Sequence, residues 1–170
     1  AGVQLLIVPS MDSLILGTGS DGISGAAPDI RPVTETDLLG RPPAAIDPDE
    51  ISAYLTGRRV LVTGAGGSIG SELCRTIARF NPASLVMVDR DESGLHATQL
   101  SIDGRAMLDS RDLELADLRD RPRLRQIFDD HRPEVVFHAA ALKHLPLLEM
   151  YPEEAWKSNV VVTHDLLEIA

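Results

Sequence analysis

Two absences limit what this chain of 170 residues can be. It holds a single cysteine, Cys74, so an internal disulfide framework is excluded. Cys74 follows Leu73 in a helical pattern, which predicts a small core residue rather than a reactive thiol. No run approaches the roughly 18 apolar residues that span a bilayer, and the short apolar start lacks the basic flank of a signal peptide. We expect a cytoplasmic segment whose only membrane contact is made through sequence outside these residues.

Further absences concern chemistry. The chain has neither the G-x-S-x-G elbow of hydrolases nor the G-x-x-x-x-G-K-[ST] phosphate loop. His138 and His144 have no cysteine or carboxylate at ligand spacing, so we predict no metal site. Acidic residues outnumber basic ones, and the formal net charge of -10 argues against a nucleic-acid partner.

What the chain does have is a glycine-rich turn between a predicted strand and a predicted helix. The aliphatic run 59–62 precedes Thr-Gly-Ala-Gly-Gly-Ser-Ile-Gly (63–70), and an apolar stripe follows at Ile69, Leu73, Ile77 and Phe80. Gly64 permits the turn, Gly67 lets backbone amides approach a phosphate, and Gly70 lets the helix lie close to the strand. The free N–H groups of the helix start attract the anion. This order predicts a site for the pyrophosphate of a dinucleotide.

A second predicted strand, 84–90, ends in a carboxylate. Asp89 lies about 20 residues after the glycine turn, where an acidic residue binds an adenosine ribose. A carboxylate there repels the additional phosphate of NADP and favours NAD. Arg90 beside it is able to accept that phosphate, so NADP remains the alternative cofactor.

Strands and helices alternate from residue 58 onward, which predicts an α/β fold. Helices at 91–102, from Asp120 and from Pro152 separate strands at 113–117 and 134–138. We expect a truncated, Rossmann-type, doubly wound parallel sheet over 58–170. We expect residues 1–57 to form an irregular extension, with a Gly/Ser-rich linker at 17–28, a proline-rich stretch and a short helix closed by Gly57.

Ligands of such sheets bind beyond the carboxyl ends of the strands, where more candidate residues fall. Asp117 ends the third strand and is a candidate either for the adenine amino group or for a cap of the next turn. The alanines 139–141 let the backbone pass close to a ligand, and Lys143 is a candidate for phosphate or sugar hydroxyls. We interpret His138 as a hydrogen-bonded core residue and leave His144 open between a ligand contact and a solvated side chain.

At these residues the chain resembles extended short-chain dehydrogenase/reductases, and more narrowly the capsular-polysaccharide branch of nucleotide-sugar 4,6-dehydratases and epimerases. The resemblance rests on TGAGGSIGSELCR (63–75), VDRDES (88–93), ADLRD (116–120), EVVFHAAALKHLPLLE (134–149) and NVVVTHDLLEIA (159–170). Residues 29–43 are similar to the linker that precedes the catalytic domain in large membrane-bound members, where it follows a small module. The resemblance thus implies that residues 1–28 are the tail of that preceding module.

The resemblance implies a reaction and a set of site residues. NAD removes a hydride from C4 of a UDP-sugar, here UDP-N-acetylglucosamine, water leaves across C5 and C6, and the hydride returns to C6. Asn159 matches a helix asparagine that supports the active site. The implied cofactor contacts come from the glycine turn and from the strand ends: Gly64, Gly67, Ser68, Ile69, Gly70, Asp89, Arg90, Asp117, Leu118, Ala139, Ala140, Ala141 and Lys143.

The chain departs from the family in that these residues hold neither its strand-end Ser/Thr segment nor its sugar-nucleotide lobe. The Tyr-x-x-x-Lys or Met-x-x-x-Lys helix that carries the proton shuttle does not occur in these residues, so we predict no catalytic residue and no turnover within them. Both ends of the chain indicate a fragment, and its exposed helix faces predict a homo-oligomer. An epimerase, or a non-catalytic dinucleotide-binding module, are the alternatives.

Overall fold

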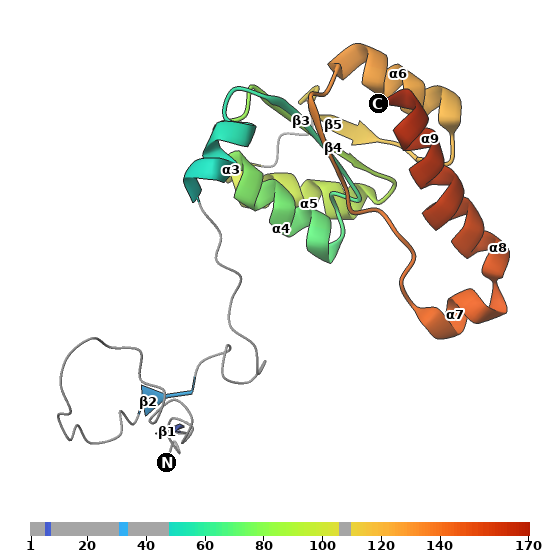
Figure 1. The fold of residues 1–170 in the computed structure, drawn as a ribbon, viewed down its shortest axis with the longest axis horizontal. Helices are drawn as coiled ribbons and strands as arrows, with labels where there is room; N and C mark the ends of the chain where they lie inside the picture. The colour runs from blue at the N-terminus through green and yellow to red at the C-terminus, as the bar shows by residue number, and fades with distance from the viewer. Residues whose placement is uncertain (1–5, 8–30, 34–47, 106–109) are drawn as a thin grey trace. The chain divides into compact units, whose positions relative to one another are not determined.

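The computed structural model describes residues 6–7, 31–33, 48–105 and 110–170 (Figure 1). The chain divides into two compact units, Ala1–Ile46 and Asp47–Ala170. In the first, strand β1 (Leu6–Ile7) pairs antiparallel with β2 (Arg31–Pro32). The predicted linker at 17–28 lies outside the described residues. Among the described residues, no helix is both long and apolar enough to cross a bilayer.

The second unit is a four-stranded parallel sheet in the order β5-β4-β3-β6. Strand β3 (Arg59–Thr63) lies at the centre and pairs with β4 (Ser84–Asp89) and β6 (Val135–His138). Strand β5 (Leu113–Leu115) extends the sheet beyond β4. Strands are added outward from β3 through β4 to β5, and the next strand, β6, is then added on the other side of β3. The boundary between β3 and β6 is therefore the switch point where Rossmann-type sheets bind ligands. The predicted fold class is confirmed.

Helices cover both faces because side chains alternate along each strand. Val60 and Val62 face a core completed by α3 (Pro48–Leu55), α4 (Ser68–Ala78) and α5 (Glu92–Asp103). Leu61 faces the opposite core, which α6 (Arg121–His131) and α9 (Val162–Ile169) complete. Figure 1 shows α4 and α5 on one side of the strands and α6 and α9 on the other.

The helix ends follow from local chemistry. Asp120 accepts a hydrogen bond from the Arg123 N–H and caps α6, as predicted. Gly57 closes α3 with a φ of 71°, and Gly104 closes α5 with a φ of 65°.

Two features of the last third differ from the expectation. A short helix, α7 (Leu145–Met150), follows the alanine run, where no element was predicted. The helix from Pro152 is composite: α8 (Pro152–Ala155) leads into a π-helical segment, η1 (Trp156–Val161), before α9. The π segment has no signature in the apolar spacing, because helices of both kinds place residues four apart near the same face.

Candidate dinucleotide-binding site

The glycine turn is packed backbone against backbone. Gly64 has a φ of 67°, and a Cβ there would lie 2.7 Å from Cα of Ala140, in the segment that leaves the neighbouring strand. A Cβ on Gly70 would lie 2.0 Å from the Gly64 oxygen, so any side chain would push α4 off the strand. Two of the predicted roles therefore have a geometric basis: Gly64 makes the turn and Gly70 allows the close approach of helix and strand.

The start of α4 is suited to an anion. Its N-cap, Gly67, carries no side chain, no side chain caps the helix, and its first turn has no acidic residue. A Cβ on Gly67 would meet only the Gly64 oxygen, at 3.3 Å, so the outer side of the turn is open. Unpaired N–H groups and the positive end of the helix dipole thus meet at an accessible backbone.

Asp89 connects the end of β4 to this turn. Its Oδ2 accepts a hydrogen bond from the Gly66 N–H at 2.8 Å, and its Oδ1 accepts one from the Asp91 N–H at 3.0 Å. The carboxylate is thereby fixed at the rim of the turn. Sequence reasoning missed Gly66 and its partner Gly94, whose backbones meet so closely that a Cβ on Gly66 would lie 2.9 Å from Gly94. Their signal is the additional glycine in each segment.

A pocket of about 180 Å³ opens beyond the carboxyl ends of the strands. It brings together most of the predicted contacts, and its lining includes Gly64, Gly67, Asp89, Arg90, Asp117, Leu118 and Ala139–Ala141. It adds residues that the sequence did not suggest: Ala116, Arg119, Leu142, Ser158 and Val162. The last two lie four residues apart on one helix face, which was a readable signal once the helix was placed.

Four predicted contacts do not line this pocket. Gly70 is buried behind the Gly64 oxygen and acts as a spacer. Ser68 and Lys143 are exposed, as is His144. Ile69 is 68% exposed, so its assignment to the buried stripe of α4 was wrong: the stripe consists of Leu73, Cys74 and Ile77, with Phe80 just beyond the helix.

Asp117 is held by a neighbouring arginine. Arg119 donates from Nε and from a terminal nitrogen to the Asp117 carboxylate, at 3.0 and 2.6 Å, and its backbone N–H donates to Oδ1 at 3.0 Å. The guanidinium bonds hold the pKa of Asp117 below its ordinary value, partly offset by desolvation. The carboxylate is ionised at neutral pH and is a hydrogen-bond acceptor only.

Asn159 braces the loop on the other side of the pocket. Its Nδ2 donates to the Leu142 carbonyl and its Oδ1 accepts from the Leu142 N–H, both at 2.9 Å. Asn159 lies in the π segment, a kind of helix that is frequent at functional sites. One side-chain amide thus fixes the backbone that follows Ala139–Ala141.

His138 is hydrogen-bonded, as interpreted, but it is an exposed residue rather than a core residue. Its Nδ1 lies 2.7 Å from Oγ1 of Thr63 and its Nε2 3.1 Å from Oγ1 of Thr163. Thr163 donates its hydroxyl hydrogen to the Asn159 carbonyl, so Nε2 carries the ring hydrogen and Nδ1 accepts from Thr63. Desolvation lowers the pKa of His138, in agreement with this neutral form.

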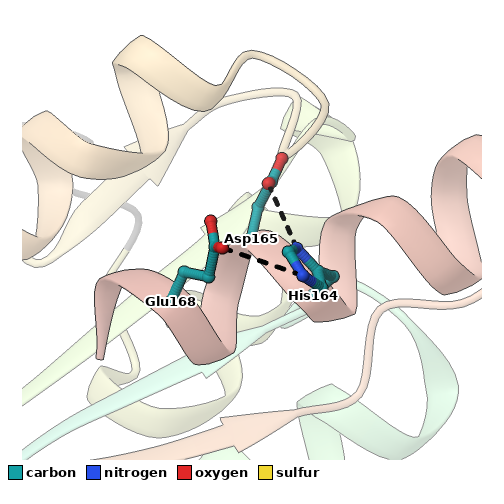
Figure 2. Close-up of side chains that lie close together, drawn as sticks. All are labelled: His164, Asp165 and Glu168. Atoms are coloured by element: carbon teal, nitrogen blue, oxygen red, sulfur yellow. Dashed lines mark ion pairs between the residues drawn. The ribbon is translucent and has the colours of Figure 1, made fainter.

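Cys74 and the acidic side chains of α9 already have structural roles. Cys74 is fully buried, and burial raises the pKa of its thiol to about 12. It is therefore a core residue, as predicted. On α9, His164, Asp165 and Glu168 lie close together (Figure 2). Arg121 donates to Asp165 at 2.7 Å and to Glu168 at 2.5 Å, so a guanidinium already balances the charge that a metal ion would balance.

The geometry of the site agrees with the known proteins to which the chain is similar. A family model described as "Polysaccharide biosynthesis protein" matches residues 60–170. The chain belongs to this family. The resemblance to capsular-polysaccharide dehydratases and epimerases of the extended short-chain dehydrogenase/reductase type is thereby confirmed.

Relatives within and around the family indicate the range of activities. The chain is 42% identical over 170 residues to the probable polysaccharide biosynthesis protein EpsC of Bacillus subtilis, covering 99% of this chain and 27% of EpsC. It is 31% identical over 107 residues to the UDP-N-acetylglucosamine 4,6-dehydratase (inverting) of Campylobacter jejuni, covering 61% of this chain and 30% of that enzyme. The chain therefore spans about a quarter to a third of these relatives.

A solved structure carries the same fold. The UDP-glucose 4-epimerase of Stenotrophomonas maltophila, with bound NAD and formylated UDP-arabinopyranose, is 32% identical with a TM-score of 0.56. The match covers 66% of this chain and 33% of the epimerase. A sheet of the same kind therefore occurs in a nucleotide-sugar enzyme with bound NAD.

Proposed function

We propose that residues 58–170 form the NAD-binding part of a nucleotide-sugar 4,6-dehydratase that acts on UDP-N-acetylglucosamine in surface-polysaccharide synthesis. The observation that carries the proposal is the pocket at the switch point of the sheet, bounded by the uncapped start of α4 and by the carboxylates Asp89 and Asp117. The similarity to the Campylobacter jejuni enzyme supports the reaction and the sugar.

The residues present fit a dinucleotide. The Cβ-free backbone at Gly67 leaves the room that a pyrophosphate needs beside the helix start, and Gly64 makes the turn that exposes it. Asp89, fixed by two backbone N–H groups, has remaining lone pairs for ribose hydroxyls, and Asp117 is an acceptor for the adenine amino group. Ala139–Ala141 offer a flat wall for the nicotinamide side. When bound, NAD supplies the acceptor and donor of the hydride.

The fixed Asp89 carboxylate supports NAD over NADP. A 2′-phosphate would be placed against a negative charge that two hydrogen bonds hold in position. Arg90 also lines the pocket, and its positive charge would favour NADP. Titration of the full-length protein with each dinucleotide tests this, and tighter binding of NADP would reverse the assignment.

Product analysis of the full-length protein tests the reaction. UDP-N-acetylglucosamine should be converted to a product that is lighter by one water and carries a 4-keto group and a C6 methyl group, both visible by NMR. Recovery of a C4 epimer of unchanged mass would support the epimerase alternative, which the Stenotrophomonas maltophila structure favours. If neither product is formed, a non-catalytic binding module is favoured.

Three further expectations belong to this proposal. Residues 1–170 alone should bind cofactor weakly at best and show no turnover, because the Tyr/Met-x-x-x-Lys segment is not among them. The protein should work on the cytoplasmic side, where nucleotide sugars are made. Self-association is expected because large apolar side chains of the last helices are exposed, including Leu145, Trp156 and Leu167.

A further inference from the structure

Two arginines on one turn connect the sheet to the composite helix 152–169. Arg119 and Arg121 both follow β5, on either side of the α6 cap Asp120. Arg119 donates to Glu154 of α8 at 3.0 Å, and Arg121 donates to Asp165 of α9 at 2.7 Å. The helix is thus held to the same turn at two points, one at each end.

Only the first of these links touches the pocket. Arg119 lines it and grips both oxygens of Asp117, whereas Arg121 is not among the lining residues. Glu154 does not line the pocket either; its hydrogen bond toward the site goes through Arg119, and its charge also acts on Arg90, which lines the pocket. The chain Asp117–Arg119–Glu154 therefore spans from the end of β5 to the start of α8.

The bonds to Arg119 limit how the Asp117 carboxylate can turn. Oδ1 accepts from the backbone N–H and Nε of Arg119, and Oδ2 accepts from a terminal nitrogen. Without the guanidinium, a carboxylate that is 38% exposed would keep only the bond from the backbone N–H, and its Oδ2 would no longer be held in one position. Glu154 in turn holds the second terminal nitrogen of Arg119, so the fork has one preferred orientation.

We propose that Arg119, anchored by Glu154, is a positioning residue that sets the preference of the pocket for an adenine base. It orients Asp117 so that a free lone pair meets an exocyclic amino group, and the same oxygen repels a base that presents a carbonyl there. This inference rests on the proposed binding of NAD. It differs from a structural role for Arg119, because a brace alone would change affinity for every dinucleotide equally.

The test compares NAD with nicotinamide hypoxanthine dinucleotide, which replaces the adenine amino group with a carbonyl. Binding of each is measured by calorimetry on the full-length protein, its Arg119→Gln and Glu154→Gln variants, and the matched control Arg121→Gln. Arg119→Gln should weaken NAD binding about fivefold, the upper range for partly exposed ion pairs, and leave the hypoxanthine analogue nearly unchanged. Arg121→Gln should preserve the ratio of the two affinities.

Two further results sharpen the outcome. Glu154→Gln should lower the ratio less than Arg119→Gln and should have no added effect in the double variant, because it acts through Arg119. Equal loss of both ligands in Arg119→Gln, or the same ratio in Arg119→Gln and Arg121→Gln, would overturn the positioning role. A wild-type protein that is folded but binds neither dinucleotide would overturn the proposed function itself, and this inference with it.

Discussion

The two walls of the pocket are built in different ways. On the α4 side, Gly64, Gly66 and Gly70 bring backbone against backbone, with no room for a Cβ at any of them. On the composite-helix side, the wall is tied to the sheet by side chains that come from distant segments: Asn159 bonds Leu142, and Arg119 bonds Glu154. The first wall depends on the absence of atoms and the second on particular polar groups.

This contrast indicates that the α4 side of the site is rigid and that the composite-helix side is adjustable. A steric wall fails when any atom is added, because the neighbouring backbone has nowhere to move. A wall held by hydrogen bonds loses one bond at a time, and water or another side chain replaces part of each loss. Substitutions on the glycine side should therefore cost more free energy than substitutions on the helix side.

The largest effect is expected from Gly64→Ala. Alanine at a φ of 67° is strained, and its Cβ would also lie 2.7 Å from the Ala140 backbone. We expect the free energy of unfolding to fall by about 3 kcal/mol or more, measured by chemical denaturation.

Gly104→Ala is the matched control for this prediction. Gly104 has nearly the same φ, 65°, but nothing lies near the position of its Cβ. The free energy of unfolding of Gly104→Ala should fall only by the cost of the left-handed backbone, about 1 kcal/mol. Equal losses in the two variants would show that the contact with Ala140 contributes nothing, and the distinction between the two walls would fail there.

An intermediate effect is expected from Asn159→Ala. The change leaves the N–H and the carbonyl of Leu142 without their side-chain partners in a half-buried place, which costs about 1–3 kcal/mol. Asn159→Asp should not restore stability, because a carboxylate opposes the Leu142 carbonyl. Lys157→Ala, in the same π segment, removes only an exposed ion pair and serves as control. Full stability of Asn159→Asp would contradict the two-bond geometry.

The smallest effect concerns pH. Desolvation places the pKa of folded His138 below the ordinary 6.5. Below pH 6.5 the unfolded chain therefore binds a proton that the folded chain resists, so His138 lowers stability as pH falls toward its folded pKa, and no further beneath it. Melting curves between pH 8 and pH 5 should show a shallower loss in His138→Gln than in the wild type. A steeper loss in the variant would mean that His138 is charged in the fold.

Much of the glycine wall could be predicted from the sequence, and little of the helix wall. Gly64 and Gly70 have a fixed spacing relative to the strand, because a local turn must reverse the chain within a few residues. Asp89 is local in the same sense, since it ends the next strand. The parallel order of the strands followed from their alternation with helices.

The helix wall depends on contacts between residues far apart in the chain. The sequence around Arg119 does not indicate that Glu154 is its partner, and the sequence around Leu142 does not indicate Asn159. Such pairs form only after the sheet has brought the segments together. Ile69 fits a helical stripe in sequence, yet it is exposed because α4 presents it away from the core. His138 likewise reads as a strand core residue but lies at the open end of β6.

The most direct test of the central claim is calorimetric titration of the full-length protein with NAD, on the wild type and on Gly67→Ala. The added methyl group would meet only the Gly64 oxygen at 3.3 Å, so the variant should melt close to the wild type. It would stand where the pyrophosphate approaches the backbone, and we predict at least about tenfold weaker NAD binding, the loss of one charge-assisted hydrogen bond. Unchanged affinity in a folded Gly67→Ala variant would contradict a dinucleotide site at the start of α4.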